Sequence, residues 1–66
     1  MSVKANEVYE TISGRRFVVV GIAYDQQTKQ KVVIFHRQRR RDEWFTIPLN
    51  RWNQSQLRYV GNLVIK

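Results

Sequence analysis

Apolar runs rich in β-branched and aromatic residues alternate with short polar segments along the chain, which predicts an all-β fold. Turn-forming or charged residues separate the runs, as expected between antiparallel strands. Strands are predicted over residues 8–12, 15–24, 31–37 and 44–49. Gly21 interrupts the strongest apolar run and indicates a bend or bulge of the kind that barrel corners need.

The pattern changes after Pro48. Alternation stops there, and Asn50 is predicted to cap a short helical turn near residues 49–56. Residues 58–65 are again apolar and predict either a last strand or a hairpin about Gly61 and Asn62.

The number of short strands and the length of the chain narrow the fold. Four or five strands and one helical turn in 66 residues predict a small, strongly bent antiparallel SH3-like barrel. An OB-type barrel is the alternative, although it usually needs a longer chain. Residues 1–7 are predicted to be a flexible lead-in and residues 8–66 a single barrel domain.

Alternation within residues 44–49 separates core from surface. Phe45, Ile47 and Leu49 fall on one face of this strand, and Trp44 falls on the other. If the first set is core, Trp44 points outward. Trp52 is expected to pack against the barrel, because a domain this small needs large side chains to fill its core.

Glycine, aromatic and apolar positions recur here at a familiar spacing: Gly14, Phe17, Val19 to Ala23, Thr28, Val33 to Phe35 and Trp44 to Leu49. The chain resembles a family of small bacterial domains of unknown function that have an SH3-like barrel, over about residues 8–52. Phe45 stands where that family has a tryptophan, and residues 34–35 depart from its valine and tyrosine. The resemblance implies the fold and no chemistry.

Charge points to an anionic partner. Twelve Lys and Arg residues against five Asp and Glu give a net charge of +7. In so short a chain this favours nucleic acid, an acidic protein or an anionic membrane surface. Of these, DNA or RNA is predicted first and an acidic protein second, with no membrane partner. The alternative is that the charge only keeps a small domain soluble.

The arginines are concentrated in residues 37–41, which lie between two predicted strands and therefore at the tip of a hairpin. If this segment is extended, Arg39 and Arg41 lie on one side and Arg40 on the other. Asp42 and Glu43 are expected to pair locally with Arg40 or Arg41. The tip suits phosphate contacts, although its charge could also serve only to discourage edge pairing.

These observations predict a nucleic-acid-binding protein with weak sequence specificity, because no recognition helix is evident. The phosphate-binding candidates are the arginines of the tip and those elsewhere in the chain, and Trp44 is a candidate for stacking on a base. The predicted binding residues are Arg37, Arg39, Arg40, Arg41, Trp44, Arg15, Arg16 and Arg51.

Two other roles fit the sequence. A protein-interaction module, such as a small regulator or inhibitor, could bind an acidic partner or hold a peptide in an aromatic groove formed by Trp44, Trp52 and Tyr59. The apolar residues 63–65 could pair across the edge of a homodimer.

Catalytic and metal-binding chemistry has little support. His36 is the only histidine, there is no cysteine, and no nucleophile–base spacing or glycine-rich phosphate loop is present. No enzyme activity, metal or cofactor is therefore predicted, and His36 is expected on an edge strand or as a polar neighbour of the arginines. No apolar run is long enough to span a membrane, and a cytoplasmic location is predicted.

Overall fold

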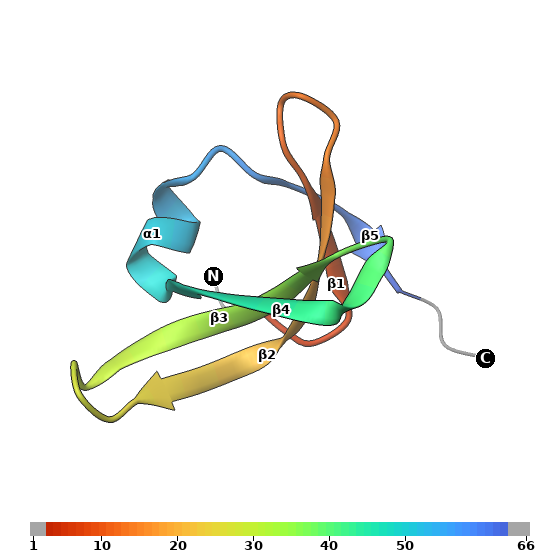
Figure 1. Cartoon of the computed structure of the whole chain (residues 1–66). Coiled ribbons are helices and arrows are strands. Elements are labelled where there is room, and N and C mark those ends of the chain that lie inside the picture. The colour runs from red at the N-terminus through yellow and green to blue at the C-terminus, as the bar shows by residue number, and fades with distance from the viewer. Residues whose placement is uncertain (1–2, 64–66) are drawn as a thin grey trace.

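The computed structural model describes residues 3–63 and shows one antiparallel sheet with a short helix (Figure 1). The strands lie in the order β4-β3-β2-β1-β5. The predicted all-β class is confirmed, as is the short helix before the last strand. The elements are β1 (Glu7–Glu10), β2 (Arg16–Asp25), β3 (Gln30–Arg37), β4 (Arg40–Pro48), α1 (Leu49–Gln54) and β5 (Arg58–Asn62).

The sheet is open. Strands β4 and β5 form its two edges, and no pairing joins them within residues 3–63. Figure 1 shows β2 and β3 as a long twisted hairpin, with α1 directly after β4. The helix packs against β3 and β4 and so covers one face of this part of the sheet. Within residues 3–63, no helix is long and apolar enough to cross a membrane.

The bend predicted at Gly21 is present. The register of β2 against β3 shifts between Val19 and Gly21, which leaves Val20 as an extra residue in β2. A bulge of this kind increases the local twist and bends the strand. It lets one long strand curve around the core.

The core lies on the face of the sheet that α1 covers. Val19 and Val33 are fully buried, and Trp52 from α1 is 4% exposed, which confirms its predicted packing role. Ile47 and Leu49 also pack against this core, as predicted from alternation. The partly buried side chains around it are Tyr9, Phe35, Ile47, Leu49 and Leu57.

The predicted alternation of β4 is confirmed for Trp44, which lies at the surface. It holds less well for Phe45, which was predicted to lie in the core. Trp44 is 61% exposed, as predicted. Phe45 is 39% exposed but packs on Phe35, with ring centroids 5.7 Å apart. It therefore lies at the margin of the core, because β4 is an edge strand of the sheet that residues 3–63 form.

The chain before β1 packs more closely than the predicted lead-in over residues 1–7. Val3 is buried in the core, and the backbone N–H of Asn6 donates to the carbonyl of Val19 over 2.8 Å. Glu7 already belongs to β1. A small domain gains from burying every available apolar side chain, which accounts for the inward position of Val3.

The C-terminal part forms a strand rather than a hairpin. Gly61 and Asn62 both pair with β1, and the N–H of Leu63 donates to the carbonyl of Asn6. Residues 64–65, predicted to extend this strand or to pair in a homodimer, lie outside the described residues. The predicted cap is wrong: α1 follows Pro48, and Asn50 lies inside its first turn, accepting a bond from the N–H of Arg51.

Candidate functional site

A tight turn organises the arginine-rich segment. Only Gln38 and Arg39 form the turn between β3 and β4, and Arg37 pairs directly with Arg40 across it. The N–H of Gln38 donates to the carbonyl of Arg16 over 3.2 Å, which ties the turn to β2. Arg37 and Arg40 therefore lie on strands, and β4 begins four residues before its predicted start at Trp44.

A bulge follows the turn. His36 pairs with Trp44 while Arg37 pairs with Arg40, so residues 41–43 are extra residues in β4. The indole N–H of Trp44 donates to the carbonyl of Arg41 over 2.9 Å and closes the bulge. Because the turn and the bulge interrupt the alternation, the segment is not extended throughout, and the condition for the predicted separation of Arg39 and Arg41 from Arg40 is not met. Arg39 and Arg40 both line the hollow described below, and Arg41 does not.

Strand pairing places a row of side chains at one end of the core face. Phe17 pairs with Tyr9 on one side and with Arg37 on the other, and Arg37 pairs with Arg40. Paired residues project from the same face of an antiparallel sheet. Phe35, two residues before Arg37, packs in the core with its ring centroid 5.3 Å from that of Phe17. On this face of the sheet, the aromatic side chains of the core are therefore followed by arginine side chains.

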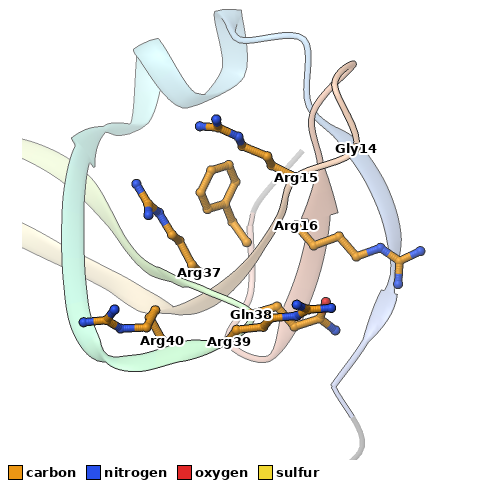
Figure 2. Close-up of a pocket in the computed structure, with 8 residues that line it drawn as sticks. Gly14, Arg15, Arg16, Arg37, Gln38, Arg39 and Arg40 are labelled. Atoms are coloured by element: carbon orange, nitrogen blue, oxygen red, sulfur yellow. The ribbon is translucent and has the colours of Figure 1, made fainter.

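The row opens into a hollow of about 730 Å³, here called the arginine hollow. Figure 2 shows Arg15 and Arg37 extending into the same open space, whereas the side chain of Arg16 turns away from it. Arginine supplies five of the eight lining residues, which are Gly14, Arg15, Arg16, Phe17, Arg37, Gln38, Arg39 and Arg40.

Carboxylates form ion pairs with two of the arginines that line the hollow. Arg16 contacts Glu10 at 3.0 Å. Arg40 contacts Asp42 at 3.7 Å and Glu43 at 3.3 Å, so the predicted local pairing forms with Arg40. No carboxylate within residues 3–63 lies in ion-pair distance of the other three arginines of the hollow, Arg15, Arg37 and Arg39.

The pairing of Arg37 with Arg40 is electrostatically unfavourable, because like charges directly opposite each other destabilise a sheet. The acids beside Arg40 offset part of this cost. Arg37 instead lies 5.8 Å above the ring of Phe45, a weak cation–π contact that leaves its charge in place. The hollow therefore concentrates positive potential, and its planar guanidinium groups suit bidentate contacts with phosphate or carboxylate.

The backbone around the hollow is held in place. Gly14 has a φ of 91°, in the left-handed region that favours glycine, and its N–H donates to the carbonyl of Thr11 over 3.0 Å. The N–H of Arg15 donates to the side-chain oxygen of Thr11 over 3.1 Å. These bonds fix the backbone of the turn from which Arg15 projects.

Not every predicted binding residue lies in the hollow. Arg41 and Trp44 lie in and after the bulge, and Arg51 is exposed on α1. The predicted aromatic groove is also absent among the described residues: Trp52 is buried, while Trp44 and Tyr59 are exposed on opposite edge strands. The structure thus joins five of the eight predicted residues at one site.

Phe17, Gln38 and Gly14 were not predicted to be parts of this site. A signal for Phe17 was available, because alternation places it on the same face as Arg15 and Val19. The position of Gln38 depends on the exact turn, which the sequence did not indicate.

His36 is a buried neighbour of the arginines of the hollow. It is 8% exposed on β3, which lies between β2 and β4, so the predicted edge position is wrong. Its Nδ1 lies 2.7 Å from the carbonyl oxygen of Arg37, which makes it a polar neighbour of the arginines as predicted. Within residues 3–63, no group of three His, Cys, Asp or Glu side chains could hold a metal ion.

Comparison with known proteins adds no assignment: no protein-family model, curated protein or solved structure matches this chain.

Proposed function

We propose that this protein binds nucleic acid, either DNA or RNA, through the arginine hollow and with weak sequence specificity. The observation that supports this is that five arginines line one hollow, three of them without a carboxylate partner among residues 3–63. Arg15, Arg37 and Arg39 contact phosphates in this proposal. Arg16 and Arg40 contribute less, because nearby acids already neutralise them.

Weak specificity follows from the kind of contact. Phosphates are the same at every position of a nucleic acid, so contacts to them set affinity and carry no sequence information. The helix α1 is six residues long and directs Trp52 into the core, which makes it unsuitable as a recognition helix in a groove.

The proposal extends to the class of fold and to the setting. We assign the bent sheet to the SH3-like barrels, an assignment supported by the short helix between β4 and β5 and by the resemblance described above. The role is binding rather than catalysis, and a cytoplasmic, bacterial setting accords with it. The edges of β4 and β5, which pair with no further strand within residues 3–63, leave room for a homodimer.

Salt dependence tests the proposed function. Binding of labelled DNA and RNA, measured by fluorescence anisotropy, should weaken steeply between 50 and 200 mM NaCl. Replacing Arg15 and Arg37 by Gln should weaken binding and reduce the slope of log K against log salt by about one to two units, because each lost phosphate contact removes about 0.7–0.9.

A matched control separates a local site from general charge. Lys4→Gln with Lys31→Gln removes two exposed cations that lie outside the hollow and should change the slope much less. Absence of binding to any DNA or RNA at low salt would refute the proposal. Retention of one acidic protein after nuclease treatment of a cell extract, without nucleic-acid binding, would favour the protein-interaction alternative.

A further inference from the structure

The arginine hollow differs from a simple phosphate-binding patch because it has an aromatic residue in its wall. Phe17 is half-buried and lines the hollow together with the arginines. Its ring meets that of Phe35 at 79°, so the two rings are not stacked face to face. Because Phe17 is only partly buried and lines the hollow, part of its side chain is within reach of a ligand that enters among the guanidinium groups.

Base-paired and unpaired nucleotides use such a surface differently. In a duplex, the faces of the bases are hidden by their neighbours, and only the grooves and the phosphates are available. In a single strand, a base can leave the stack and lie against an aromatic ring or a guanidinium plane, which contributes to affinity with little dependence on sequence. An aromatic wall adds to binding only if the base is unpaired.

Size and rigidity also suit a single nucleotide. The volume of about 730 Å³ lies within the range of about 300–1,000 Å³ that is usual for pockets holding small ligands. The bond from Arg15 to Thr11 and the bond from Gln38 to Arg16 hold the two sides of the hollow. A backbone held in this way loses little freedom on binding, so the cost of ordering falls on the exposed arginine side chains.

We propose that the arginine hollow seats one unpaired nucleotide, with its base against Phe17 and its flanking phosphates on Arg15, Arg37 and Arg39. The ligand class is therefore single-stranded nucleic acid. This inference rests on the proposed function and deepens it, since it names the form of nucleic acid that the site accepts.

Three ligands of equal length test the inference without any change to the protein: a labelled single strand, the corresponding duplex, and a strand with an abasic spacer at every position. The single strand should bind at least about fivefold more tightly than the abasic strand, the lower end of what one stacked base contributes. It should also bind more tightly than the duplex, despite the higher charge density of the duplex.

A variant then locates the stacked base. Phe17→Leu keeps an apolar side chain in the wall and should reduce binding of the single strand to about the level of the abasic strand, while binding of the abasic strand itself stays unchanged. Circular dichroism checks that the variant is folded. If the variant is not folded, the comparison of the three ligands still tests whether an unpaired base contributes to binding.

Equal binding of all three ligands would overturn the inference and leave the proposed function standing, because phosphate contacts alone would explain it. Absence of binding to every ligand at low salt would instead refute the proposed function itself. Full affinity of folded Phe17→Leu for the single strand would also overturn the inference.

Discussion

The two tryptophans show how much the place of a residue decides its role. Trp52 is 4% exposed and lies in the core with Val19 and Val33. Trp44 is 61% exposed and acts through its N–H, which donates to the carbonyl of Arg41 and closes the bulge of β4. One side chain fills the core, whereas the other shapes the backbone beside the arginine hollow.

Alanine substitution should separate these roles. Trp52→Ala is expected to lower the free energy of unfolding by about 3–5 kcal/mol, which approaches the whole stability of a domain this small. Trp44→Ala should cost no more than about 1.5 kcal/mol, the range for one hydrogen bond and some exposed surface. Urea denaturation followed by circular dichroism measures both. Equal losses would contradict the assignment of Trp52 to the core.

Tyr9 links the core to the pH dependence of stability. Its hydroxyl donates to Oε1 of Glu7 over 3.1 Å, and its ring packs against that of Trp52 in a T-shaped arrangement. Burial, together with the hydrogen bond to Glu7, raises the pKa of Tyr9 to about 12. The folded protein therefore resists loss of this proton, whereas the unfolded chain loses it near pH 10.

This shift predicts a loss of stability at alkaline pH. The contribution of Tyr9 is fully present below about pH 10 and is lost as the pH rises from about 10 to 12. Urea denaturation across this range should show a steeper fall in the native protein than in Tyr9→Phe, which cannot ionise at this position. Parallel curves for the two proteins would contradict the prediction.

At the scale of elements, Glu10 joins three strands. It lies on β1, where it pairs with Arg16 of β2 and with Arg58 of β5. Its carboxylate contacts Arg16 at 3.0 Å and Arg58 at 2.7 Å. The hydrogen bonds from Arg16 and Arg58 lower the pKa of Glu10. Strand β5, an edge strand, is held to the sheet by this contact as well as by its backbone bonds.

Acidification should release this contact. The stabilisation is present above the ordinary pKa of a glutamate, about 4.3, and is lost as the pH falls through the lowered pKa of Glu10. Glu10→Gln should lower stability at pH 7 and reduce the loss of stability in acid. A double-mutant cycle with Arg58→Gln measures the coupling of the pair. Fully additive losses in that cycle would show that the contact contributes nothing.

At the scale of the whole molecule, a net charge of +7 is carried on a body whose longest extent is 33 Å. In 10 mM salt the screening length is about 30 Å, so every cation repels nearly every other one. At 150 mM it is about 8 Å, and only neighbours such as Arg37 and Arg40 still interact strongly. Repulsion within the folded state should therefore depend on salt.

This repulsion predicts that NaCl stabilises the protein. The melting temperature should rise by a few degrees between 10 and 150 mM NaCl, because a change of 1 kcal/mol shifts it by about 4–8 °C in a domain of this size. The rise should be smaller when Arg15 and Arg37 are both replaced by Gln. A melting temperature that falls with salt would mean that ion pairs such as that of Glu10 outweigh the repulsion.

The elements of this protein could be predicted from local patterns. Alternation of apolar residues, together with turns at Gly14 and after Asp25, located the first four strands, and the break after Pro48 located α1. The bend at Gly21 and the burial of Trp52 were also predictable. These features depend on neighbours in sequence or on the size of a side chain, and both are visible in the chain itself.

The arginine hollow was decided by the tertiary structure. Arg15 and Arg37 are far apart in sequence and meet only because β2 pairs with β3 in one register. Arg39 and Arg40 join them because the turn has two residues, and Arg41 is excluded because a bulge follows. The sequence by itself determined the strands and the excess of positive charge, whereas only the pairing of strands decided which charges share a site. The physical reason is that a slip of one residue moves every side chain of a strand to the opposite face.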